Sequence, residues 1–470
     1  MLTVRSRLPE PPRPPQPRRG RRPPGPRSRF PGALLVAFRR DPLGFLTAVA
    51  RRYGDVAEFR LGPQRVVLLS HPDHVRDVLV TQHRRFHKGV GLQRAKHLVG
   101  EGLLTSEDEL HQRQRRLIQP AFHHERIESY AAVMAAEAER TAARWAEAAA
   151  GGADPRALDV HREMQRLTLL IVGRALFHGD LEAEADDIGR ALATSLDSFR
   201  RFTMMPFASL LERLPLPATL RFAGARRRLD AVIERLVAER RADGADRGDL
   251  LSLLLFAQDE TGRPAVEEGQ LRDELMTLLL AGHETTATAL TWTWYLLARH
   301  PEVERRLHQE VDRVLAGSRA GAADFDRLDY TRRVLAEAMR VYPPAWVLGR
   351  LAVADYEVAG YRFPPGTLVL VSQWVLHRDP RFFPDPERFD PERWTEPARA
   401  ARPRFAYFPF GGGPRGCIGE PFAWMEGVLV LATLARRWRL RLARDGAITL
   451  QPSVTLRPEG GMPMILEARS

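Results

Sequence analysis

The sequence predicts a single, mainly helical domain with a small β region. Three observations support this fold class. A helical pattern runs from Pro264 to Arg299, and at 1.5 Å per residue it would span roughly 50 Å. Hydrophobic residues make up 44% of the 470 residues, which is enough for a large core. No Gly/Ser-rich linker or internal repeat divides residues 30–470, so we expect one domain there and a disordered Pro/Arg-rich extension at residues 1–29.

The positive charge is concentrated in this extension. Residues 1–29 contain nine arginines and one glutamate, a net charge of +8 out of the total of +12. The remaining 441 residues therefore carry only +4, and we expect no nucleic-acid partner. Proline pairs prevent a helix, so the segment is expected to be a solvated extension, with contact to an anionic membrane surface as the alternative.

Cysteine content and hydropathy indicate the cellular setting. The only cysteine, Cys417, excludes an intrachain disulfide and fits a reducing cytoplasm. No apolar run is long enough and free enough of charge to span a membrane, so we expect no integral membrane association.

Local patterns predict two β hairpins and four long helices within the domain. The hairpins are expected at Val56 to Leu69, turning at Gly62-Pro63, and at Tyr356 to Val371. The helices are expected at Glu109 to about Ala150, Pro264 to Arg299, Asp329 to Val341, and Glu420 to about Arg436.

Cys417 lies in the glycine-rich stretch Phe410-Gly-Gly-Gly-Pro-Arg-Gly-Cys-Ile-Gly419, just before a helical run. Glycines let the backbone approach a large flat group, and the positive end of the following helix favours a thiolate. One cysteine cannot form a tetrahedral zinc site or an iron–sulfur cluster. A thiolate ligand to a haem iron explains the stretch best, with a buried free cysteine as the alternative.

These ten residues match the pattern F-x-x-G-x-R-x-C-x-G, and the chain here resembles the cytochrome P450 family of haem-thiolate monooxygenases. The resemblance extends over residues 30–470, since three other motifs of the family occur in its order: His111 four before Arg115, Ala281-Gly-His-Glu-Thr-Thr286, and Glu337 three before Arg340. It implies haem b as cofactor. The cofactor-binding residues that it implies are His111, Arg115, Arg350, Phe410, Arg415 and the iron ligand Cys417. For His111 and Arg115 an ordinary basic helix face is the alternative.

In the segment Ala281 to Thr286 an acid and a hydroxyl interrupt an apolar stretch. A carboxylate beside an alcohol can pass protons into a dry pocket, and a local opening at Gly282 would leave room for dioxygen. The resemblance gives this catalytic role to Glu284 and Thr285. Alternatively, Thr285 bonds back to a helix carbonyl and bends the axis, and both can hold together.

Glu337 and Arg340 share a helix face because they are three residues apart. The resemblance implies that they form a buried structural triad with an arginine from a later loop, and that this triad supports the loop before Cys417. Arg393 is the better candidate than Arg388, because its spacing to Phe410 fits the family better.

The candidates for the substrate pocket come from four segments. They are Phe199, Met204, Ala281, Ala345, Val347, Leu348 and Met462. The cluster around Phe199 and Met204 is expected either to pack in the core or to form a mobile entrance lid.

The resemblance implies a monooxygenase that inserts one atom of O2 into a C–H bond of a small apolar molecule such as a terpenoid, carotenoid or fatty acid. No flavin- or nicotinamide-binding segment follows Gly419, so a separate ferredoxin or flavodoxin with its reductase is expected to supply electrons. A peroxide-driven peroxygenase and a non-catalytic haem sensor are the alternatives. The pair Glu284 and Thr285 argues against both.

Overall fold

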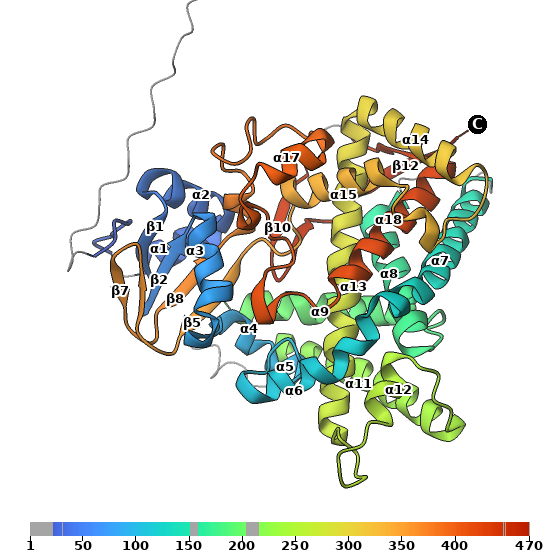
Figure 1. Cartoon of the computed structure of the whole chain (residues 1–470), viewed down its shortest axis with the longest axis horizontal. Helices are drawn as coiled ribbons and strands as arrows, with labels where there is room; N and C mark the ends of the chain where they lie inside the picture. Colours follow the sequence, from blue (N-terminus) through green and yellow to red (C-terminus); the bar gives the residue numbers. More distant parts are fainter. Residues whose placement is uncertain are drawn as a thin grey trace, which may run out of the picture.

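The structure is a computed structural model that describes residues 22–30, 32–150, 158–203, 216–444, 446 and 448–469, with the backbone only for 199–203. A large helical body lies beside a smaller β region formed by strands from both ends of the chain (Figure 1). The predicted fold class, mainly α with a small β region, is confirmed.

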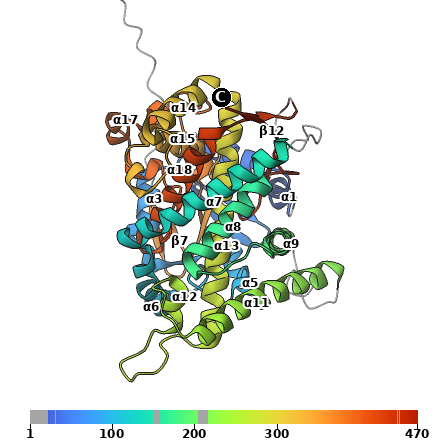
Figure 2. The same cartoon turned by 90° about the vertical axis from the view of Figure 1, so that its right-hand side faces the viewer.

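Helix α13 (Glu268–Arg299) runs through the helical body and packs most extensively on α8 (Val160–Phe177) (Figures 1 and 2). It begins at Glu268, four residues later than predicted, and ends before Pro301, which starts the next helix. Its side chains are buried almost all round, including Trp292 and Trp294. Such a helix belongs in the interior of a large protein.

The other helices surround α13 or cover the sheet (Figure 1). They are α1 (Ala33–Arg40), α2 (Pro42–Tyr53), α3 (Pro72–Arg76), α4 (Val90–Arg94), α5 (Lys96–Val99), α6 (Asp108–Ile118), α7 (His124–Ala150), α9 (Ala185–Thr203), α11 (Pro217–Asp243), α12 (Leu250–Leu255), α14 (Pro301–Leu315), α15 (Asp329–Val341), α16 (Gln373–Leu376), α17 (Glu396–Ala400) and α18 (Glu420–Arg437). None of the described helices is both long and apolar enough to cross a membrane. The helix predicted from Glu109 to Ala150 is two helices, because a 3-10 turn containing Pro120 separates α6 from α7.

The main sheet has five strands in the order β1-β2-β8-β5-β3. The hairpin predicted at residues 56–69 is confirmed as β1 (Val56–Leu61) and β2 (Gln64–Leu69). The second predicted hairpin is shorter than expected: β6 (Tyr356–Val358) pairs with β7 (Tyr361–Phe363), and β8 (Leu368–Val371) joins the main sheet. Pro364 and Pro365 follow β7 and separate it from β8, since proline cannot donate to a ladder.

Seven further strands are described. They are β3 (Phe86–Lys88), β4 (Leu158–Asp159), β5 (Leu348–Ala352), β9 (Trp438–Leu442), β10 (Leu450–Pro452), β11 (Leu456–Pro458) and β12 (Pro463–Ala468). Strands β10 and β11 form a hairpin, while β4, β12 and β9 form a three-stranded sheet.

Residues 1–21 of the predicted extension lie outside the described residues. Its last part packs on the domain. Glu58 N on β1 donates to the Pro24 carbonyl at 2.9 Å, and a Cβ on Gly25 would lie 1.8 Å from the Glu58 carbonyl oxygen. Residues 24 and 25 of the predicted extension therefore contact β1, and the two backbones lie too close together there for a side chain at Gly25.

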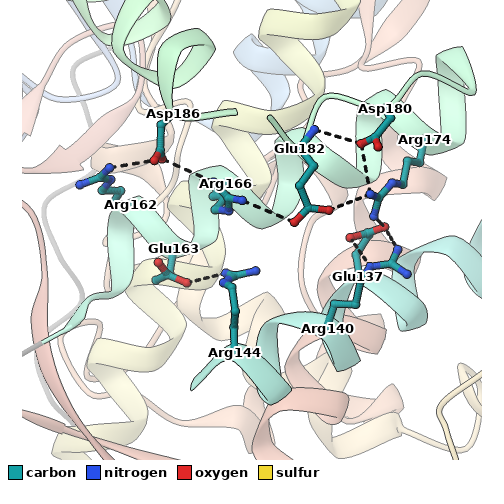
Figure 3. Close-up of polar contacts among 10 residues, drawn as sticks. All are labelled: Glu137, Arg140, Arg144, Arg162, Glu163, Arg166, Arg174, Asp180, Glu182 and Asp186. Carbon is teal, nitrogen blue, oxygen red and sulfur yellow. Dashed lines mark hydrogen bonds and ion pairs between the residues drawn. The ribbon is translucent and has the colours of Figure 1, made fainter. Parts of the chain in front are cut away.

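A network of ion pairs connects α7, α8 and the start of α9 (Figure 3). Glu137 is buried on α7 and accepts from Arg174 of α8, which also donates to Glu182 at 2.9 Å. Asp186, in the first turn of α9, lies 3.2 Å from Arg162 of α8. The beginning of α9 is therefore anchored to the helical body.

Candidate functional site

The loop before α18 presents Cys417 three residues ahead of the helix. Cys417 N donates to the Phe410 carbonyl at 2.9 Å, which closes the loop on itself. Gly413 has φ 69° and a Cβ there would lie 2.0 Å from the Leu79 carbonyl oxygen, so only glycine fits. The loop conformation is thus fixed by its backbone contacts.

The Cys417 side chain is exposed, yet burial raises the pKa of its thiol to about 11, while the N–H of Gly419 lowers it. A sulfur can be accessible and still be surrounded by protein when it faces an interior space. A bound iron would deprotonate the thiol outright. The Gly419 N–H, at the N-cap of α18, then stabilises the thiolate, as the sequence predicted.

Five cationic or basic side chains gather near this loop: Lys88 of β3, His111 and Arg115 of α6, Arg350 of β5, and Arg415 of the loop. Burial, reinforced by the neighbouring positive charges, lowers the pKa of His111 to about 3 and that of Arg350 to about 10. Burial also lowers the pKa of Lys88 to about 7.

These groups have too few acidic partners. Glu107 pairs with Arg415, but within the described chain the His111 ring and the Arg350 guanidinium form no ion pair. Among the described residues, Arg350 donates only to the carbonyl of its neighbour Gly349. A ligand carrying carboxylates would neutralise the excess charge, so the residues present fit a haem with its propionates.

The structure brings together the residues that the sequence predicted for the cofactor. Arg115 Nη1 donates to the Gly416 carbonyl at 2.8 Å and so ties α6 to the Cys417 loop. Arg116, beside it, points to solvent. Lys88 was not predicted. Its Nζ donates to the carbonyls of Leu103 and Ser106, and no local pattern indicates such contacts.

The triad predicted from sequence is present as a set of contacts. Glu337 and Arg340 are fully buried and share two hydrogen bonds of 2.9 Å. Arg393 Nε lies 3.3 Å from Glu337, whereas the Arg388 side chain is 70% exposed. The Trp394 ring N–H donates to the same carboxylate at 2.9 Å, so Glu337 organises the segment that leads to the Cys417 loop.

On α13, Thr285 Oγ1 donates to the Ala281 carbonyl at 3.0 Å, which is the back-bond considered from sequence. The helix is continuous, so the predicted opening at Gly282 is absent. A Cβ on Gly282 would lie 2.9 Å from Val172 of α8. Close packing of the two helices explains this glycine, and it does not leave room for a ligand there.

Glu284 faces a partner that the sequence did not indicate. Its carboxylate accepts from Arg457 Nε of β11 at 2.5 Å, from Thr455 Oγ1 at 2.7 Å and from Gln165 Nε2 at 3.0 Å. Burial alone would raise the pKa of Glu284, but the charge of Arg457 outweighs it, and the pKa falls to about 2. The side chain is therefore an ionised carboxylate in a buried ion pair.

The predicted pocket residues divide into three groups. Ala281, Ala345, Val347 and Leu348 are half-buried. Met462 has no exposed surface and packs in the main core, since its carbonyl bonds to Val160 N at the start of α8. The prediction that Met462 contacts substrate is therefore corrected. The side chain of Phe199 and all of Met204 lie outside the described residues.

Comparison with known proteins gives consistent results. The family model for Cytochrome P450 matches residues 23–463. The chain is 44% identical to cyclooctatin synthase and 40% identical to cyclooctat-9-en-7-ol 5-monooxygenase, both from Streptomyces melanosporofaciens, over 93% and 92% of each chain. It is 38% identical to pentalenene oxygenase from Streptomyces avermitilis, over 91% of this chain and 92% of the relative. The chain belongs to the cytochrome P450 family and is a haem-iron monooxygenase that uses dioxygen, an organic substrate and electrons from redox partners.

Proposed function

We propose that the protein hydroxylates a cyclic terpenoid at a C–H bond, with haem b as its cofactor. The observation that supports a terpenoid substrate is the similarity to cyclooctat-9-en-7-ol 5-monooxygenase, which covers 92% of this chain. Half-buried apolar side chains at Ala345, Val347 and Leu348 suit such a molecule, because an apolar pocket with few polar groups favours a hydrocarbon skeleton.

Each binding role follows from contacts of this chain. Cys417 would be the iron ligand, since it is the only cysteine and lies at the positive end of α18. His111, Arg115, Arg350 and Arg415 would hold the propionates, and Phe410 would pack beside the ring. When bound, a thiolate-ligated haem supplies the dioxygen activation that side chains alone do not.

We propose that Glu284 and Thr285 both take part in proton delivery, in different roles. Thr285 is half-buried and holds its hydroxyl proton on the Ala281 carbonyl, from which it can be presented to a ligand. Glu284 is held by Arg457, so the carboxylate must leave this pair before it can exchange a proton with Thr285. Thr285 is therefore the proximate proton donor and Glu284 the more distant one.

We further propose that a ferredoxin or flavodoxin with its reductase delivers the electrons, in the cytoplasm. Membership of a family whose monooxygenases use redox partners supports this proposal.

The substrate proposal is tested by titrating the purified haem protein with cyclooctat-9-en-7-ol, pentalenene and a long-chain fatty acid. Displacement of a water ligand by substrate shifts the haem absorption spectrum. We expect saturable shifts with at least one of the two terpenoids and hydroxylated product in a reconstituted turnover. Binding and turnover of the fatty acid alone would contradict the terpenoid class.

The reaction class is tested in the same reconstituted system by replacing the redox partner with hydrogen peroxide. We expect turnover with ferredoxin and reductase to exceed peroxide-driven turnover at least tenfold. Equal or faster turnover with peroxide would instead indicate a peroxygenase.

A further inference from the structure

His377, which follows α16, is fully buried and bonds in two directions. Its carbonyl accepts from Arg340 Nη1 at 2.9 Å. Its ring Nε2 accepts from the backbone N–H of Phe408 at 3.1 Å. His377 therefore contacts both Arg340 of the triad and the segment that leads into the Cys417 loop.

Aromatic rings fix the orientation of the imidazole. The ring centroids of Tyr407 and Phe408 lie 4.9 and 5.4 Å from it, and that of Phe383 lies 6.4 Å away. The Tyr407 hydroxyl in turn donates to the Ala336 carbonyl of α15 at 2.9 Å. The imidazole has little freedom to turn away from Phe408, so its acceptor nitrogen stays on that N–H.

The acceptor role requires a neutral ring with its proton on Nδ1. Burial and the nearby charge of Arg340 lower the pKa of His377 well below its ordinary value. This shift favours the neutral ring that the contact to Phe408 requires.

A short path of backbone bonds connects Phe408 with the sulfur-bearing residue. The Phe408 carbonyl accepts from Gly411 N at 3.0 Å, and the Phe410 carbonyl accepts from Cys417 N at 2.9 Å. If Nε2 were removed, the buried Phe408 N–H would lose its only hydrogen-bond partner among the described residues, which is unfavourable for a buried donor. The chain would relieve that cost by shifting, and the shift would reach Phe410 and Cys417.

We infer that His377 is a positioning residue that, through its Nε2 bond to Phe408 N, holds the Cys417 loop in the geometry that keeps Cys417 an anionic iron ligand. The inference rests on the proposed role of Cys417. The simpler view is that His377 only fills the core, in which case its loss lowers stability without changing the ligand.

The experiment compares four variants of the haem-loaded protein with the wild type. His377→Phe and His377→Leu remove the acceptor. His377→Gln places an amide oxygen near the position of Nε2. Phe383→Leu is the packing control, since it loosens contacts with the same ring but leaves Nε2 in place. The measured quantities are the melting temperature and the fraction of reduced, carbon monoxide-bound protein with the Soret band of a thiolate ligand.

We expect both non-accepting variants to lose at least half of the thiolate-type band, or their haem, while His377→Gln and Phe383→Leu keep more than nine tenths of it. If the non-accepting variants melt earlier but keep the full thiolate-type band, the inference is wrong. It is equally wrong if His377→Gln loses the band as they do. A wild-type protein without the thiolate band would instead overturn the proposed ligand role itself.

Discussion

Two buried Glu–Arg pairs of the described chain differ in how completely the arginine is bonded. Glu337 accepts from Arg340, from the Trp394 ring N–H and from the Asp390 backbone N–H, while Arg393 Nε lies 3.3 Å away as an ion pair without a hydrogen bond. The three side-chain nitrogens of Arg340 all donate, either to Glu337 or to carbonyls of the following segment. Glu284 accepts from three donors, but among the described residues Nη2 of its partner Arg457 is buried without a partner.

The difference separates a pair with a structural role from a pair whose contacts can change. A buried arginine whose nitrogens are all bonded is held rigidly, and removal of its carboxylate partner leaves buried donors unpaired. A pair with an unsatisfied donor is closer in free energy to other arrangements. Glu337 therefore holds the approach to Cys417 in place, whereas Glu284 lies in a pair that can rearrange next to Thr285.

The largest expected effect comes from breaking the network around Glu337. Glu337→Gln leaves Arg340 and Arg393 without their buried counter-charge, so we expect the free energy of unfolding to fall by about 3–5 kcal/mol, with most of the haem lost. Urea unfolding and the haem-to-protein ratio measure this. The matched control is Arg388→Ala, an exposed arginine of the same segment, which should change stability by less than about 0.5 kcal/mol. Equal effects of the two variants would contradict the assigned triad.

Arg457→Gln breaks the incomplete pair and should cost about 3 kcal/mol at neutral pH. In the wild type the folded pKa of Glu284, about 2, lies below its ordinary 4.5, so the pair stabilises the protein above pH 4.5, and this stability is lost as the pH falls toward 2.

Without Arg457, burial should raise the pKa of Glu284 above 4.5, and this site should lose stability as the pH rises through that value. Melting temperatures between pH 3 and 7 should therefore show a more negative slope in Arg457→Gln than in the wild type. The double variant Glu284→Gln/Arg457→Gln lacks the titrating group and should not show this change. An unchanged slope in the single variant would mean that Glu284 does not depend on Arg457.

Thr285→Ala tests proton delivery next to the Glu284–Arg457 pair, and it should cost less stability than the variants above. We expect haem content and melting temperature to stay close to wild type, because alanine suits a helix interior, while product per electron falls at least twofold and peroxide rises. Thr288→Ala is the control, since Thr288 makes the same kind of back-bond, to the Glu284 carbonyl. The same loss of coupling in both variants would show that back-bonding, not proton delivery, matters.

The smallest effect should come from the N-terminus, which belongs to neither pair. Deletion of residues 1–21 should leave haem content unchanged and stability within about 0.5 kcal/mol. Deletion of residues 1–29 should cost about 1 kcal/mol more, because the bond from Glu58 N to the Pro24 carbonyl is lost. If both deletions were neutral, the contacts of residues 23–25 with β1 would contribute nothing.

Local sequence patterns predicted the elements and residue pairs that depend on residues close together in the sequence. The hairpin at residues 56–69 and the helix from Asp329 to Val341 were predicted with their observed bounds, because alternation and helical spacing are local properties. The pair of Glu337 and Arg340 follows from a spacing of three residues on such a helix. The loop at Cys417 was predicted because a single cysteine among glycines leaves few chemical uses.

Contacts between distant segments could not be predicted in this way. Arg457 reaches Glu284 across 173 residues, and His377 reaches Phe408 across 31 residues. The predicted opening at Gly282 was wrong for the same reason, since Val172, which fills the space beside it, comes from another helix. Which residues share a cavity or a buried network depends on tertiary packing, and a single sequence carries no periodic signal for it.

The central claim is that Cys417 is the thiolate ligand of a haem iron, and the most direct test is the absorption spectrum of the reduced protein under carbon monoxide. We expect the wild type to show the Soret shift peculiar to a thiolate ligand, and Cys417→His to lack it while the body of the protein stays folded by circular dichroism. If Cys417→His retained the wild-type spectrum, the sulfur would not bind the iron, and the account given for the loop would be contradicted.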